Sequence, residues 1–219
     1  MNSSKKILLV GRDNWQNDDE LNLLLYEYLS KSKHEIIWED PAGNLLYQFI
    51  HIIDQQKSIP TTIKKILIHW TQFIYRAFYH SFIIITRKNV MVHRSQKLKK
   101  VISKLGDEKD IVILSRSSGG RLSSLIADEL KVKHIICLGY PFQHPEKGVE
   151  PERYEHLKYL KTPMLILQGE QDEYGGIEIK NKYELSPSIK MSYVATDHEF
   201  KLCGDGWNEV LTQINHILN

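Results

Sequence analysis

Residues Ile111–Gly120, with the sequence Ile-Val-Ile-Leu-Ser-Arg-Ser-Ser-Gly-Gly, decide the fold of this chain of 219 residues. The apolar run at its start predicts a buried strand, and the helical pattern that follows predicts a sharp strand-to-helix turn. Such a turn needs small residues two positions before and after its centre. Ser115 and Gly119 meet this requirement around Ser117, although Ser115 stands where glycine is usual. A serine held there exposes its hydroxyl oxygen, so Ser117 is a candidate nucleophile.

Two later segments end in the partners that a nucleophilic serine needs. The segment Pro163–Asp172 combines an apolar strand with a Gly-x-x-Asp loop at its end. The strand-like run Ile189–Ala195 is followed by Asp197 and His198. The carboxyl ends of parallel strands meet at one edge of a sheet. We therefore expect His198 to act as the base for Ser117 and Asp172, rather than Asp197, to orient it.

Beyond this order, two signatures resemble the small dienelactone-hydrolase-like branch of the α/β hydrolases, which includes testis-expressed protein 30. They are Ser115–Arg121 (Ser-Arg-Ser-Ser-Gly-Gly-Arg) and Gly139–Pro145 (Gly-Tyr-Pro-Phe-Gln-His-Pro). The resemblance extends from Ser115 to the C-terminus and implies the nucleophile, acid and base roles for Ser117, Asp172 and His198. It implies no particular substrate.

The alternation of strand-like and helical patterns predicts an α/β fold, a three-layer sandwich with about six mostly parallel strands. Residues 1–219 are expected to form one such domain. If the strands are numbered as in the α/β-hydrolase fold, this chain would lack strands one and two. Its six strands would then lie across the sheet in the order four, three, five, six, seven, eight. The expected strands are Lys6–Val10, Glu35–Trp38, Ile111–Leu114, His134–Leu138, Met164–Leu167 and Ile189–Ala195.

Residues 41–104 are longer than the connection that such a fold needs, which predicts a helical insertion. Leu45–Ile53 looks helical, and a second helix is expected from Pro60. A cap over the active site is the leading interpretation. Additional core or a dimer interface is the second, and a basic aromatic helix lying on an anionic membrane surface is the third. Lys64 and Lys65, with other polar residues, argue against a spanning helix.

The net charge of +2 hides an uneven distribution. Between Asn44 and Leu105 the sequence contains eleven lysines and arginines but only one acidic residue, Asp54. This segment is either a solvated helix surface or a face for an anionic partner, so peripheral membrane binding or self-association through residues 44–88 stays open. Lys97–Lys104 has few interleaved aromatic residues, so no nucleic-acid partner is expected. The N-terminal apolar run is too short for a signal peptide, which predicts a cytoplasmic protein.

An acyl-transfer site also needs donors for an oxyanion. The backbone N–H of Ser118, at a helix N-terminus, is one candidate, and Arg12, in the loop after the first strand, is the other. Arg116, Tyr140 and His144 are candidates for substrate binding, but a salt bridge of Arg116 and a rigid loop after Tyr140 are the structural alternatives. No metal-ligand spacing and no cofactor motif occur, so neither group is expected.

Together these patterns predict a serine hydrolase that acts on an ester or thioester of a small or medium acyl group. The alternative is a non-catalytic binding protein on the same fold that uses the basic, aromatic insertion as its interface. A fold-level analogy cannot decide between the two.

Overall fold

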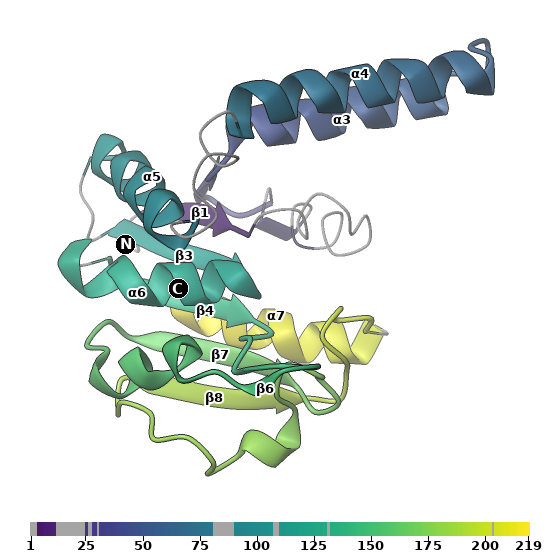
Figure 1. The fold of residues 1–219 in the computed structure, drawn as a ribbon. Helices are drawn as coiled ribbons and strands as arrows, with labels where there is room; N and C mark the ends of the chain where they lie inside the picture. The colour runs from purple at the N-terminus through teal and green to yellow at the C-terminus, as the bar shows by residue number, and fades with distance from the viewer. Residues whose placement is uncertain are drawn as a thin grey trace. The chain divides into compact units, whose positions relative to one another are not determined.

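The computed structural model describes residues 4–11, 25, 28–29, 31–80, 90–106, 110–130, 132–202 and 204–219 (Figure 1). The chain divides into two compact units: residues 1–39 together with 95–219, and residues 40–94. The described elements are β1 (Lys6–Val10), β2 (Glu35–Trp38), α3 (Pro41–Gln55), α4 (Thr61–His80), α5 (Val90–Lys104), β3 (Ile111–Arg116), α6 (Ser118–Leu130), β4 (His134–Leu138), β5 (Gln143–His144), β6 (Gly148–Val149), η3 (Pro151–Arg153), η4 (Glu155–Tyr159), β7 (Met164–Gly169), η5 (Ile177–Ile179), β8 (Ile189–Val194) and α7 (Gly204–Leu218).

The first unit contains a six-stranded sheet in the order β2-β1-β3-β4-β7-β8, in which every pairing is parallel. This confirms the six predicted strands and their predicted spatial order. Two of the interior strands, β3 and β7, are buried at every position. Such continuous apolar runs are typical of parallel strands that are covered on both faces.

Helices cover both faces of this sheet. Alternate residues of the strands, such as Leu114 and Leu167, pack in one core with α7 residues Trp207 and Val210. The opposite face carries α6, whose Gly120 lies against Cys137 of β4. Figure 1 shows α6 and α7 on either side of the strands. The result is the predicted three-layer arrangement.

The second unit contains a hairpin of α3 and α4. Pro41 fits the first turn of α3 because its missing N–H would have no partner inside the helix. The helical insertion expected over about residues 41–104 includes this whole unit except its first residue, and the unit ends at Arg94. The rest of α5 belongs to the first unit, where Leu98 and Ile102 are buried. Among the described residues, none of the helices combines the length and continuous apolar character that a bilayer-spanning segment needs.

The sequence also predicts a helix from Asp18 to Leu29, and a continuation of the second insertion helix or a short extended piece at Phe82–Ile85. Both fall largely or wholly outside the described residues. The helix expected before Leu29 is described only at Leu25, Tyr28 and Leu29, of which the two leucines are buried in the core beside α7. The short extension expected at Phe82–Ile85 is not described.

Candidate active site

Ser117 occupies the turn between β3 and α6 with a backbone φ of +48°. This left-handed conformation is uncommon for a residue with a side chain and is typical of strained, functional turns. The Ser117 N–H donates to the carbonyl oxygen of Leu138 at 3.0 Å, which ties the turn to the end of β4. The Ser115 hydroxyl, where glycine was expected, donates to the Ile136 carbonyl oxygen at 2.9 Å and is fully buried.

The start of α6 packs closely against the end of β1, and Gly119 makes this possible. A Cβ atom at Gly119 would lie 2.3 Å from the Val10 carbonyl oxygen and 3.0 Å from the Gly11 Cα. No larger residue fits there without a shift of the backbone. The small-residue requirement seen in the sequence therefore comes from the neighbouring strand as well as from the turn.

Three side chains from the ends of three strands form one hydrogen-bonded line. The Nε2 atom of His198 lies 3.0 Å from the Ser117 Oγ, and its Nδ1 lies 2.8 Å from the Asp172 Oδ2. A carboxylate can only accept, so the His198 Nδ1 carries the proton and Nε2 accepts the Ser117 hydroxyl proton. The structure thus brings together the three residues that the sequence singled out.

The loop that carries His198 reaches Asp172 by passing over Gly169 at the end of β7. A Cβ atom at Gly169 would lie 2.6 Å from the Thr196 carbonyl oxygen and 2.7 Å from that of Asp197. A hydrogen bond from the Gln171 N–H to the Thr196 carbonyl oxygen, at 3.0 Å, holds the two loops together. Glycine at this position lets the two strand-end loops approach closely enough for His198 to bond Asp172.

Asp172 is held by further donors that the sequence pattern did not reveal. Its Oδ2 also accepts a hydrogen bond from the Gln168 amide nitrogen at 2.8 Å, and its Oδ1 accepts one from the Tyr174 N–H at 2.8 Å. Burial raises the pKa of Asp172 above its usual value, and the hydrogen bond from His198 opposes this rise. The Tyr174 ring lies against the His198 imidazole, with 4.4 Å between the ring centroids.

Gln168 is a fully buried amide whose two ends connect separate parts of the site. Its nitrogen donates to Asp172 and also to the Gly175 carbonyl oxygen at 2.7 Å, and its oxygen accepts the Tyr140 N–H at 2.9 Å. A polar residue at a buried strand position, one residue before Gly169, was the available sequence signal for this role.

Arg116 was a candidate for substrate binding, with a bracing salt bridge as the alternative. Its side chain is fully buried, and its guanidinium donates to the Glu199 carboxylate at 3.0 Å and to the Glu199 carbonyl oxygen at 3.1 Å. The contact is that of the bracing alternative, between the residue before Ser117 and the residue after His198.

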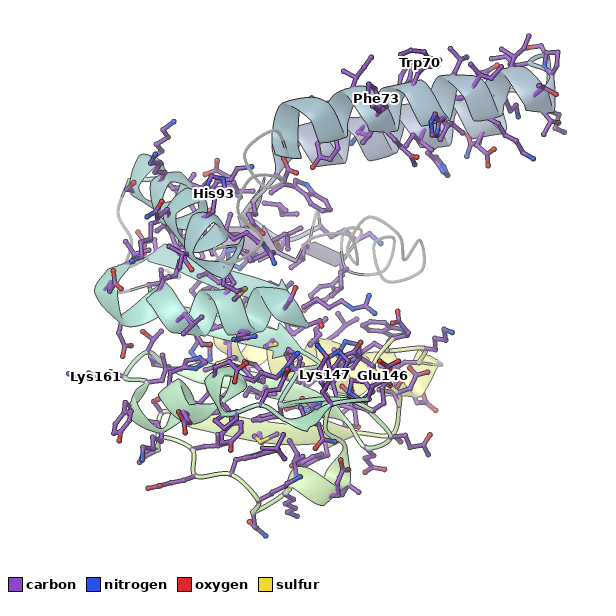
Figure 2. The ribbon with its side chains drawn as sticks, viewed as in Figure 1. Trp70, Phe73, His93, Glu146, Lys147 and Lys161 are labelled. Carbon is purple, nitrogen blue, oxygen red and sulfur yellow. The ribbon has the colours of Figure 1, made fainter. Side chains whose placement is uncertain are left out.

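The other two substrate-binding candidates also make internal contacts. Tyr140 is fully buried, and its hydroxyl donates to the Arg153 carbonyl oxygen at 2.6 Å. The ring of His144 accepts the N–H groups of Glu146 and Lys147 at 3.2 and 3.3 Å. It thereby caps the β5–β6 hairpin turn, whose Glu146 and Lys147 are labelled in Figure 2.

Of the two expected oxyanion donors, one is described. Ser118 is the first residue of α6, so its N–H has no acceptor within that helix. Arg12 lies outside the described residues, although Gly11 just before it lies against Gly119 at the start of α6.

Within the described part of the chain, no group of three or more histidine, cysteine, aspartate or glutamate side chains is arranged to hold a metal ion.

Several solved structures share the fold at low sequence identity. An esterase from Pyrococcus furiosus is 12% identical with a TM-score of 0.60, over 99% of this chain and 83% of its own. A CIB-like hydrolase from Thermoplasma acidophilum is 15% identical with a TM-score of 0.58, over 100% of this chain and 87% of its own. The thioesterase domain from the curacin biosynthetic pathway is 9% identical with a TM-score of 0.56, over 100% and 92%.

No curated protein matches this sequence. The family model that describes the alpha/beta hydrolase domain matches residues 86–216, which is more than half of the chain. The matched segment includes Ser117, Asp172 and His198 as well as the four strands from β3 to β8 in the main sheet. The chain belongs to the α/β-hydrolase family.

Proposed function

We propose that this protein is a serine hydrolase that cleaves an ester or thioester of a small or medium acyl group. The observation that carries the proposal is the line from the Ser117 Oγ through His198 to Asp172, with separations of 3.0 and 2.8 Å. Serine is a weak nucleophile until an adjacent base takes its proton, and a third group must orient that base. The separations within this group are those that the three proposed roles need.

In the proposed reaction, Ser117 Oγ attacks the acyl carbon while its proton passes to His198 Nε2. The tetrahedral intermediate collapses as His198 gives that proton to the leaving alcohol or thiol, which leaves the acyl group on Ser117. A water molecule then gives its proton to His198 and attacks the acyl-serine, and His198 returns the proton to Ser117 as the carboxylic acid leaves. Asp172 stays ionised and stabilises the imidazolium in both halves.

The negative oxygen of the intermediate would be bound by the Ser118 N–H at the N-terminus of α6, whose dipole favours negative charge. The second donor in this proposal is the N–H of Arg12. Removal of one such donor costs about a hundred- to a thousand-fold in rate, so the two N–H groups are a large part of the proposed catalysis.

The acyl class is supported by likeness to solved structures, and the sequence signatures support a narrower placement within the family. Structural neighbours are named as an esterase and a thioesterase domain. The Ser115–Arg121 and Gly139–Pro145 signatures support membership of the dienelactone-hydrolase-like branch within the family. Ester and thioester substrates share the acyl carbon and differ in the leaving group, so both belong to one proposed reaction.

The test is labelling of the purified protein with a fluorophosphonate probe, which reacts with activated serines. Labelling is expected for the wild type and is expected to be lost in Ser117→Ala. Ser103→Ala, at an exposed serine on α5, is the matched control and should label like the wild type. Absence of labelling in a folded wild type would contradict the proposal and favour the non-catalytic binding protein.

A further inference from the structure

The α3–α4 hairpin carries an apolar surface that faces solvent. On α4 its members recur at spacings of three and four residues, which places them along one side of the helix. Trp70 and Phe73 are 59% and 58% exposed and touch edge to face, with 6.0 Å between the ring centroids. We call the following exposed residues the apolar stripe: Leu45, Phe49, Ile52, Ile63, Ile66, Leu67, Trp70, Phe73 and Ile74.

The contacts that hold the hairpin together use a different side of α4. Lys64 and Tyr75 are half-buried, and they bond the Asp54 carbonyl oxygen and the Asp40 carboxylate. The more apolar side of α4 is therefore exposed to solvent. Figure 2 labels Trp70 and Phe73 on this helix. Large apolar side chains that are exposed together on one side of a helix are typical of interaction sites.

The charge of the hairpin unit favours an anionic occupant for the stripe. Residues 40–94 contain seven lysines and arginines against the two acids Asp40 and Asp54, a net charge of +5. Lys65 and His69 are exposed on α4, interleaved in sequence with the stripe. Two copies of so basic a unit repel each other, which argues against a second copy of this chain as the occupant.

We propose that the α3–α4 hairpin binds the surface of an anionic lipid bilayer, with the apolar stripe inserted at the level of the headgroups. Tryptophan and phenylalanine beside basic residues on an amphipathic helix are typical of segments that lie in this interface. Lysines near an anionic surface add to the binding, and salt weakens their contribution. The inference rests on the hairpin alone and does not depend on the role of Ser117.

The experiment is sedimentation of the full-length protein with vesicles of phosphatidylcholine alone or of phosphatidylcholine mixed with phosphatidylserine. Binding is expected to the mixed vesicles and to weaken at high salt. Lys57→Gln with Lys65→Gln should weaken it about 25-fold, since each basic residue near the surface contributes about a fivefold change in affinity. Trp70→Ser with Phe73→Ser should abolish it, whereas Tyr159→Ser, at an exposed aromatic residue of the other unit, should leave it unchanged.

A second readout locates the stripe in the bilayer. Brominated lipid is expected to quench tryptophan fluorescence in the wild type, and Trp70→Phe, which keeps the apolar surface, should bind but lose the quenched component. Failure to sediment with either vesicle would overturn the proposal. So would a dimer in solution that the Trp70 and Phe73 double variant dissociates, which would make a second copy the occupant. A change in KM for a p-nitrophenyl ester in that variant, with vesicle binding unaltered, would also overturn it and favour the cap.

Discussion

Arg116 and Glu199 form a clamp across the candidate active site. The fully buried Arg116 guanidinium bonds both the carboxylate and the carbonyl oxygen of Glu199, at 3.0 and 3.1 Å. Arg116 directly precedes Ser117, and Glu199 directly follows His198. The hydroxyl and the imidazole therefore lie on two segments that the Arg116 side chain connects, and we expect this contact to help maintain the 3.0 Å distance between Ser117 and His198.

Replacement of Arg116 by methionine should remove the contact between these two segments. The loss of hydrogen bonds made by a buried charged group should lower the free energy of unfolding by about 1–3 kcal/mol. A shift of His198 by about 1 Å should lower kcat about a hundredfold. Glu199→Gln is the milder control, because the Glu199 side chain is half exposed and the contact to its carbonyl oxygen remains. Urea denaturation and the steady-state rate on p-nitrophenyl butyrate measure both effects, and equal loss in the two variants would contradict the clamp.

Asp172→Asn should remove most of the activity while leaving the fold intact. Asparagine can donate to the His198 Nδ1 and so favour the wrong tautomer, in which Nε2 carries the proton and cannot accept that of Ser117. We expect kcat to fall by about 10³- to 10⁴-fold. The steady-state rate measures this, and circular dichroism checks the fold. Asp197→Asn, at the neighbouring acid that the sequence also offered, should retain activity, and a larger loss there would reassign the orienting acid.

Gln168 is predicted to be a positioning residue that acts through Asp172. Gln168→Leu removes a donor to the ionised carboxylate, which raises the pKa of Asp172 further. We expect kcat to fall about tenfold with KM unchanged, since one hydrogen bond to a charged group is worth about 1.5–3 kcal/mol and part of this acts on the fold. In the plot of kcat against pH, the fall in activity on the acidic side should move to higher pH. A variant that loses only stability, with an unmoved pH profile, would mean that Gln168 is structural.

The sheet and the central hydrogen-bonded line could be predicted because both follow from periodicity. Most of the strands are apolar runs, and each candidate residue lies in the loop that follows one of them. The parallel topology therefore brings Ser117, Asp172 and His198 to the same edge of the sheet. The contacts of Gln168 and Glu199 could not be predicted. Glu199 bonds Arg116 from far along the chain, and Gln168 bonds Asp172 and backbone groups of Gly175 and Tyr140. Both sets of contacts depend on how neighbouring loops pack, and no spacing rule encodes this.

What the helical insertion contacts could not be predicted, for a different physical reason. Lys97–Lys104 lies in the basic segment for which a solvated helix surface was one interpretation, and its Lys100 and Lys104 are exposed, whereas Leu98 and Ile102, four residues apart, are buried in the first unit. In α4 the apolar pattern predicted a helix but not what its apolar side contacts. Periodicity identifies such a side, whereas its occupant depends on partners outside the helix.

The acid sensitivity of the fold should come in part from His156. Burial, aided by the charge of Arg121, lowers the pKa of His156 to about 4, and its Nε2 lies 2.8 Å from the Ser124 hydroxyl. The unfolded imidazole titrates near 6.5, so between pH 6.5 and 4 the unfolded state binds more protons. The stabilisation by neutral His156 is therefore fully present above pH 6.5 and is lost as the pH falls toward 4. We expect about 1 kcal/mol less stability at pH 5 than at pH 7, given the part of the ring that meets solvent.

His156→Gln isolates this contribution, because glutamine keeps a polar partner for Ser124 but does not titrate in this range. Urea denaturation at pH 7 and pH 5 should show a smaller difference in the variant, by about 1 kcal/mol. His134, whose pKa burial also lowers to about 4, should give a similar and additive decrease in His134→Gln. Asp172 contributes to the pH dependence of stability with the opposite sign, since its raised pKa favours the native state at low pH. This contribution is the same in the variants and the wild type, so it cancels in the comparison. An unchanged pH difference in His156→Gln would show that protonation of this imidazole does not limit the acid stability of the fold.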